Sequence, residues 1–167
     1  PGSCLYEFKK MNILITGCNG FIGRELSSHF PNSKYNIYLT NRENLNILNE
    51  EEVDNFFAKN KVDIVVHSAV KGGRRNHKES YKEFLANMIM YENLSKHADN
   101  FKLMFHFGSG AEFDRRENID NAKEREIYDQ LPVDFYGLSK NLIAKKIRKF
   151  DSNIINLRLF GCFGVLE

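Results

Sequence analysis

A short apolar run that leads directly into three glycines constrains this chain more than any other feature. The run is Ile-Leu-Ile at 13–15, and Gly17, Gly20 and Gly23 follow it. The run predicts a buried strand, and the apolar spacing over 21–30 predicts an amphipathic helix. A strand, a glycine turn and a helix in this order open a dinucleotide-binding sheet.

Each glycine has a physical task in such a unit. Gly17 lets the chain turn sharply off the strand, Gly20 leaves room for a pyrophosphate, and Gly23 lets the helix pack closely. The helix start at Phe21 and Ile22 would offer N–H groups and a positive dipole end to the phosphates. The alternative is a tight turn before an ordinary helix, because the G-x-x-G-x-x-G spacing is a weak signal by itself.

The rest of the chain alternates strands and helices, which predicts an α/β fold. Strands are expected at 13–15, 36–40, 45–48, 62–67, 103–107 and 154–160, and helices at about 21–30, 50–60, 78–99 and 136–150. This alternation gives a Rossmann-type, doubly wound parallel sheet with helices on both faces. Six strands suit the order 3-2-1-4-5-6, with ligands at the carboxyl ends of the strands.

Composition excludes several classes of protein. A net charge of +2 over 167 residues is too balanced to favour nucleic acid or a membrane surface as a partner. No apolar run approaches membrane length. Three scattered cysteines predict neither a disulfide framework nor a metal site, and they fit a reducing, cytoplasmic compartment.

Tyr136 and Lys140 are the second chemical signal. They lie four residues apart on a predicted helix, so they share a face. An ammonium near the phenol favours the phenolate, which suits the tyrosine to pass a proton to or from a substrate oxygen. A Y-x-x-x-K pair is also common on helix surfaces, where the lysine is merely solvated.

Ser109 is the third signal, because it ends a predicted strand where a parallel sheet presents its ligand-facing groups. Its hydroxyl would bond a reacting oxygen, or it would cap its own turn. His67 and His106 lie within apolar strands and are expected to be core residues rather than ligands.

Together these motifs resemble the extended short-chain dehydrogenase/reductase family, in its epimerase, dehydratase and reductase branch. The matching segments are 16–23, 62–69, Ser109, Tyr136 with Lys140, and 157–164. Segments 41–48 and 69–73 are similar to the GDP-L-fucose synthase-like reductases. Gly110 and Phe113 depart from that group, which usually has a serine and a tyrosine at these two positions.

The resemblance implies a role for each site residue. Ser109 would polarise the substrate oxygen, and Tyr136 would be the acid/base. Lys140 would lower the pKa of the tyrosine and bind the nicotinamide ribose. The remaining cofactor-binding residues would be Gly17, Asn19, Gly20, Phe21, Ile22, Gly23, Asn41, Arg42, Ser68, Ala69 and Val70. Asn87 would face the active-site end from the long predicted helix.

The end of the second predicted strand favours NADP over NAD. NAD sites hold the ribose hydroxyls with an acid there, but this chain has Asn41 and Arg42, and no acid before Glu43. A guanidinium suits a 2′-phosphate. In the alternative, Arg42 is solvated and Glu43 binds the ribose.

The resemblance also implies a nucleotide-sugar substrate. Lys71, Arg74 and Arg75 would meet its diphosphate, or they would form a solvated basic loop. Residues 1–10 are interpreted as a leader and 11–167 as the cofactor domain. A separate substrate domain, which extended members carry, is expected to be missing, and the apolar surface left open would favour association, for example as a homodimer. The alternative function is a non-catalytic dinucleotide-binding or regulatory module.

Overall fold

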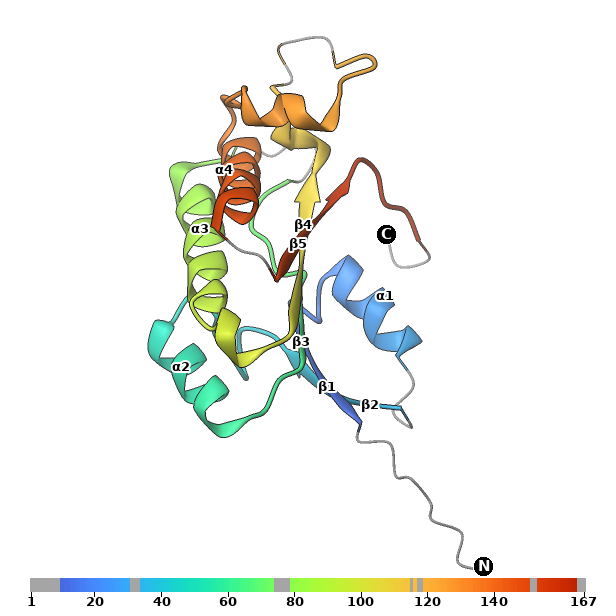
Figure 1. Ribbon diagram of the computed structural model, residues 1–167, viewed down its shortest axis with the longest axis vertical. Helices are drawn as coiled ribbons and strands as arrows, with labels where there is room; N and C mark the ends of the chain where they lie inside the picture. Colours follow the sequence, from blue (N-terminus) through green and yellow to red (C-terminus); the bar gives the residue numbers. More distant parts are fainter. Residues whose placement is uncertain are drawn as a thin grey trace, which may run out of the picture.

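The protein is described by a computed structural model over residues 10–30, 34–73, 79–114, 116, 119–150 and 153–164. A five-stranded parallel sheet has the order β2-β1-β3-β4-β5 (Figure 1). The strands are β1 Met11–Thr16, β2 Tyr35–Thr40, β3 Ile64–His67, β4 Leu103–Ser109 and β5 Ile154–Leu159. The helices are α1 Phe21–His29, α2 Glu50–Lys59, α3 Tyr81–Ser95 and α4 Phe135–Phe150, with short 3-10 helices η1 Ala98–Asn100, η2 Gly110–Glu112 and η3 Glu124–Tyr128. The predicted α/β fold class is confirmed.

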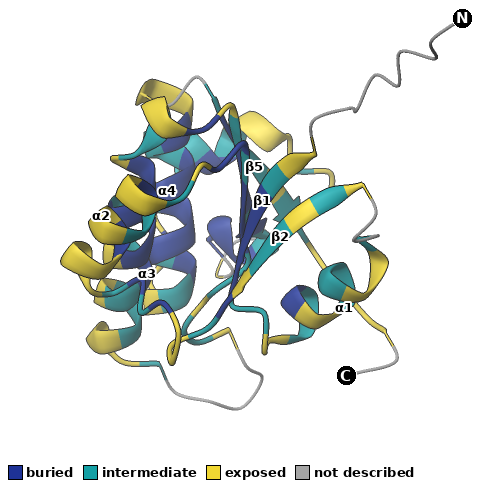
Figure 2. Cartoon of the chain, turned by 90° about the horizontal axis from the view of Figure 1, so that it is seen from below, coloured by how far each residue is buried: buried dark blue, intermediate teal, exposed yellow. Residues whose placement is uncertain are grey.

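The inner strand β1 carries the apolar run 13–15 because both of its faces are covered. Leu14 faces the larger core, which lies against α2, α3 and α4. Ile13 and Ile15 face a smaller core against α1. Figure 1 shows α1 on one side of the sheet and the other three helices on the opposite side. The buried residues in Figure 2 gather where α3 and α4 meet the strands.

Side-chain caps set the starts of two helices. The Asn49 side chain accepts from the N–H of Glu51 at 3.1 Å and so begins α2. Ser80 and Glu83 form a capping box, which begins α3 at Tyr81 rather than at the predicted residue 78. Within the described ranges, no helix is long and apolar enough to cross a membrane.

The strand expected at 45–48 is wrong, because this segment is a turn. Asparagine side chains bond the local backbone instead of leaving it to a sheet: Asn44 Oδ1 accepts from Asn41 N at 2.8 Å, and Asn46 Oδ1 accepts from Leu48 N at 3.3 Å. The alternating leucine and isoleucine fill the core beneath α2 and α3. With this strand removed, the predicted order matches the observed one.

Candidate functional site

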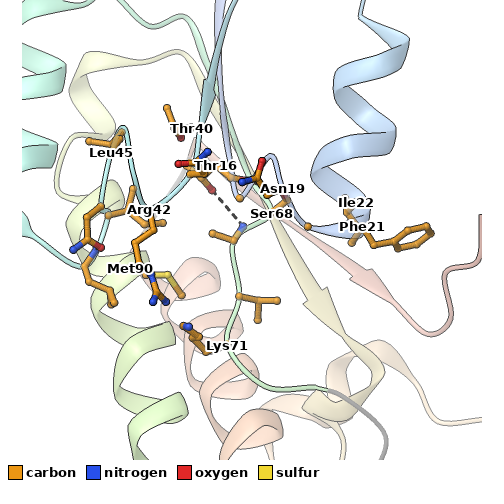
Figure 3. A pocket seen from close by; sticks show the side chains of 18 of the residues that line it. Thr16, Asn19, Phe21, Ile22, Thr40, Arg42, Leu45, Ser68, Lys71 and Met90 are labelled. Carbon is orange, nitrogen blue, oxygen red and sulfur yellow. Dashed lines mark hydrogen bonds between the residues drawn. The ribbon is translucent and has the colours of Figure 1, made fainter. Parts of the chain in front are cut away.

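A cavity of about 540 Å³ opens at the carboxyl ends of β1, β2 and β3. In Figure 3 the turn after β1, with Asn19 and Ile22, lies on one side of it, and Arg42 and Leu45 lie on the other, with Ser68 between them. The cavity is lined by Thr16, Gly17, Asn19, Gly20, Phe21, Ile22, Thr40, Asn41, Arg42, Leu45, Asn46, Ile47, Leu48, Ser68, Ala69, Val70, Lys71, Gly72, Gly73, Met90 and Tyr136. Its size suits a small-molecule ligand.

The glycine turn is shaped so that backbone lies against backbone. Gly17 has φ of +69°, and a Cβ there would lie 2.7 Å from the Cα of Ala69. A Cβ on Gly23 would lie 2.3 Å from the carbonyl oxygen of Gly17. Gly20 is the N-cap of α1 and provides no side-chain cap. The first turn of α1 therefore starts at the cavity wall without a side chain over its end.

Side-chain bonds fasten the ends of β1 and β3 together beneath the cavity. Thr16 Oγ1 lies 2.9 Å from His67 Nδ1 and accepts from Ala69 N at 3.3 Å. Ser68 Oγ donates to the Thr16 carbonyl at 2.5 Å. The two turns that carry Gly17 and Ala69 are thus held in fixed relation to each other.

The next part of the wall, Lys71 to Gly73, is held from α3 by Asn87. This buried amide accepts from Lys71 N at 2.8 Å and donates to Lys71 O at 2.9 Å. It also donates to Ser139 Oγ at 3.1 Å. The resemblance placed Asn87 toward the active-site end, and its observed contacts are with the loop after β3 and with α4.

Glu79 joins the same loop to the start of α4. Its Oε1 accepts from Gly73 N at 2.7 Å, and its Oε2 accepts from Tyr136 N at 3.0 Å. A carboxylate at a helix N-terminus is favoured by the helix dipole. This contact sets Tyr136 against the loop so closely that a Cβ on Gly73 would lie 2.9 Å from Tyr136 Cζ.

Among the described residues that line the cavity, Arg42 and Lys71 are charged and none is acidic. Glu43 is exposed and is outside the lining. Its N–H bonds Asn41 Oδ1 at 2.8 Å, which turns the chain immediately after Arg42. The electrostatic character of this end of the cavity therefore suits an anion.

Lys140 lies behind Tyr136 rather than in the cavity. It is 4% exposed, its Nζ is 5.9 Å from the centre of the Tyr136 ring, and it donates to the Phe107 carbonyl at 2.6 Å. Burial lowers the pKa of Lys140 to about 8, although the negative charge of Glu112 opposes this change. The predicted shared face of tyrosine and lysine is present, but the ammonium bonds the end of β4.

Ser109 ends β4 and caps the short helix η2. Its Oγ accepts from Ala111 N at 3.2 Å, and its own N–H donates to Glu112 Oε1 at 3.0 Å. Ser109 does not line the cavity. The capping alternative for this serine is therefore observed, and a role toward a substrate stays a prediction.

The two strand histidines are core residues, as expected. His67 is 2% exposed and His106 is 1% exposed, with ring centres 5.3 Å apart. Burial, together with the nearby Lys140 charge, lowers the pKa of His67 to about 3 and that of His106 well below its usual value. Both rings are therefore neutral at physiological pH.

The cavity gathers all of the expected cofactor residues except Gly23, which lies behind the turn, and Lys140. The ring of Phe21 points away from the cavity in Figure 3. Sequence reasoning gave no cofactor role to Thr16, Thr40, Leu45, Asn46, Ile47, Leu48, Lys71, Gly72, Gly73 and Met90, which also line it. The asparagines within 41–46 indicate a turn, and this signal would have predicted that several of these residues lie at the cavity wall. Arg74 and Arg75 lie outside the described residues.

Comparisons with known proteins agree with this geometry. The chain is 29% identical to a dTDP-D-glucose 4,6-dehydratase from Dictyostelium discoideum over 91% of its length and 44% of that protein. It is 26% identical to a GDP-L-colitose synthase from Yersinia pseudotuberculosis over 59% of the chain and 33% of that protein. It thus spans less than half the length of these curated relatives.

Solved structures share the fold. A GDP-D-glycero-L-gluco-heptose synthase from Campylobacter jejuni, solved in the presence of NADPH, has a TM-score of 0.77 at 22% identity, over 93% of this chain and 49% of that one. A GDP-mannoheptose C4 reductase from the same organism, with NADP bound, has a TM-score of 0.76 at 22% identity, over 90% and 51%. The model of the NAD dependent epimerase/dehydratase family matches residues 13–166, and the chain belongs to this family.

Proposed function

We propose that this chain is the NADP-binding part of an enzyme that transfers hydride to or from a nucleotide sugar. The observation that carries the proposal is that the glycine turn, two basic residues and Tyr136 all line the same cavity. Bound NADP would supply the chemistry of hydride exchange with the sugar.

The cavity fits such a cofactor on grounds of shape. A side chain at Gly17 would collide with Ala69 and one at Gly23 with the Gly17 carbonyl, so the turn packs closely against the loop after β3 and against α1. The amino end of α1 has no side-chain cap and lies at the wall, where a diphosphate would receive N–H bonds. Gly20 and Asn19 would flank that diphosphate.

The charges of the cavity favour NADP over NAD. Arg42 would pair with a 2′-phosphate, and Lys71 would add a second positive charge. Glu43, the residue that would have bound a ribose hydroxyl in an NAD site, is outside the lining. This preference is supported by relatives of the same fold that were solved with NADPH or NADP.

The chain's own residues would move the proton. Tyr136 would exchange a proton with the sugar oxygen, and the Lys140 ammonium behind it would favour the phenolate. Ser109 would bond the same oxygen after releasing its cap to Ala111. The nucleotide-sugar class is supported by the names of the relatives, which are dehydratases, synthases and reductases of such sugars.

One observation favours a second candidate, a dinucleotide-binding module without catalysis. Ser109 Oγ and Lys140 Nζ are both engaged with backbone, and neither residue lines the cavity. In that function Tyr136 would only close the wall of the cavity.

A pair of tyrosine variants separates the two functions. Tyr136→Phe should bind NADPH as tightly as the wild type in a fluorescence titration, but its hydride transfer to a nucleotide sugar should fall about a hundredfold or more. Tyr81→Phe is the control, because Tyr81 is 55% exposed and lies outside the cavity. Equal hydride transfer by wild type and Tyr136→Phe would remove Tyr136 from the mechanism, whereas NADPH binding without hydride transfer by the wild type would favour the module.

A further inference from the structure

Glu112 is a buried carboxylate that the proposed function does not use. It is 0% exposed in η2, immediately after the end of β4. Its Oε1 accepts from Ser109 N at 3.0 Å and from Asn156 Nδ2 at 3.1 Å, and its Oε2 accepts from Arg158 Nε at 2.7 Å. Every one of these donors is held by β4 or β5.

Arg158 pairs with this carboxylate from β5. Its side chain is 6% exposed, and its Nη1 also donates to Glu124 Oε1 at 2.5 Å. Glu124 is 76% exposed, so the arginine joins one buried acid to one solvated acid. A buried ion pair contributes little net stability over apolar packing of similar volume. Stability alone therefore does not explain why the Glu112–Arg158 pair lies at the end of β4.

The end of β4 is held from both sides by opposite charges. The Lys140 ammonium donates to the carbonyl of Phe107, and the Glu112 carboxylate accepts from the N–H of Ser109, two residues later. Gly108 lies between them, and a Cβ there would be 2.2 Å from Glu112 Oε1. The two charged groups thus form hydrogen bonds to the same short stretch of backbone.

We propose that Glu112, held in place by Arg158, is a positioning residue that fixes the Ser109 backbone and places a carboxylate on the opposite side of the β4 end from the Lys140 ammonium. Its use in catalysis rests on the proposed function, in which Ser109 and Lys140 act on one substrate oxygen.

Several other groups face Lys140, and none of them provides a compensating negative charge. His67 from β3 and His106 from β4 are buried and neutral, and Tyr136 lies on the same helix, α4. Burial lowers the pKa of Lys140 to about 8, and the Glu112 charge raises it against that burial. Loss of the Glu112 charge should therefore lower the pKa of Lys140 further.

Two conservative variants separate the charge of Glu112 from its length. Glu112→Gln keeps the length and removes the charge, so Lys140 should titrate at a lower pH than in the wild type. Glu112→Asp keeps the charge but is too short to reach Ser109 N, so the Ser109 amide should exchange with solvent about tenfold faster while Lys140 titrates nearly as before. Glu124→Gln, which removes a solvated acid from the same arginine, should change neither result.

Both quantities can be measured by NMR on the whole chain without cofactor. Lysine labelled at Cε and Nζ reports the titration, with Lys140→Arg to assign its signal, and amide exchange reports Ser109. Thermal unfolding would establish that each variant is folded. An unchanged Lys140 titration in folded Glu112→Gln, together with unchanged Ser109 exchange in folded Glu112→Asp, would overturn the proposal.

The outcome for catalysis is separable from the proposed function. If the wild type transfers hydride and Tyr136→Phe does not, Glu112→Gln should move the alkaline limit of kcat to lower pH, and Glu124→Gln should leave it in place. A profile that does not move would overturn the positioning role while the proposed function stands. If no NADPH binds but both NMR changes occur, the proposed function fails and the structural role of Glu112 stands.

Discussion

At the cavity after β1, β2 and β3 the glycine turn packs backbone against backbone, whereas the end of β4 is held by buried charged side chains. In the first region, shape comes from Gly17 and Gly23, where no side chain fits. In the second, Glu112 and Lys140 bond the backbone on either side of Gly108. The first region should thus be most sensitive to added volume, and the second to changes of charge and pH.

The difference teaches how one site divides two tasks. A cofactor diphosphate is met by N–H groups, which a turn and a helix start can supply without side chains. Proton transfer needs groups whose charge is set by their surroundings, and burial with a chosen partner sets it. Tyr136 lies where the two regions meet, since it lines the cavity and lies beside Lys140.

Added volume at the glycine turn should give the largest effect. Gly23→Ala should lose NADPH binding and destabilise the fold by at least about 3 kcal/mol, because the new Cβ would lie 2.3 Å from the Gly17 carbonyl. Thermal unfolding and a fluorescence titration would measure this. Gly161→Ala is the control, because nothing lies within 4 Å of a Cβ there. Equal effects of the two substitutions would contradict the expected sensitivity of the glycine turn to added volume.

Asn87 tests whether side chains also support the region around the cavity. Asn87→Leu should cost about 2 kcal/mol, because the half-buried N–H and C=O of Lys71 lose their partner and the Ser139 hydroxyl loses one of its two bonds. NADPH affinity should fall as well, since Lys71 lines the cavity. Chemical denaturation would measure the cost. Asn36→Leu, at an exposed position on β2, is the control.

The neutral histidines predict a loss of stability in acid. The pKa of His67 is about 6.5 when unfolded and about 3 when folded, so its contribution is complete above pH 6.5 and declines as the pH falls toward 3. At pH 5 this histidine alone should have cost about 2 kcal/mol. Denaturation at a series of pH values would measure it. His67→Gln should flatten the dependence, whereas His29→Gln, on the surface of α1, should leave it steep.

Arg42 should give the smallest effect, confined to one cofactor. Arg42→Ala should raise KM for NADPH about tenfold, the loss of one charge-assisted bond, and change KM for NADH little. Steady-state kinetics with both cofactors would decide it, with Arg24→Ala on the exposed side of α1 as the control. Equal changes for both cofactors would show that Arg42 does not recognise the 2′-phosphate.

Local pattern was sufficient for much of this protein. The apolar runs at 13–15 and 62–67, the glycine turn and the helical spacing at 136–150 each depend on neighbours in sequence, so they predicted β1, β3, α1 and α4. The same pattern misassigned 45–48, because alternation cannot distinguish an exposed edge strand from a turn whose apolar side chains enter the core. The asparagines around it were the better signal.

The sequence by itself determined a parallel α/β sheet, its glycine turn and the shared face of Tyr136 and Lys140, because these follow from short-range periodicity and steric rules. Only the tertiary structure decided that Lys140 bonds β4, that Glu79 and Asn87 hold the loop after β3, and that Glu112 meets Arg158. Contacts between residues 16 to 57 positions apart depend on how the strands are ordered, and spacing along the chain does not encode them.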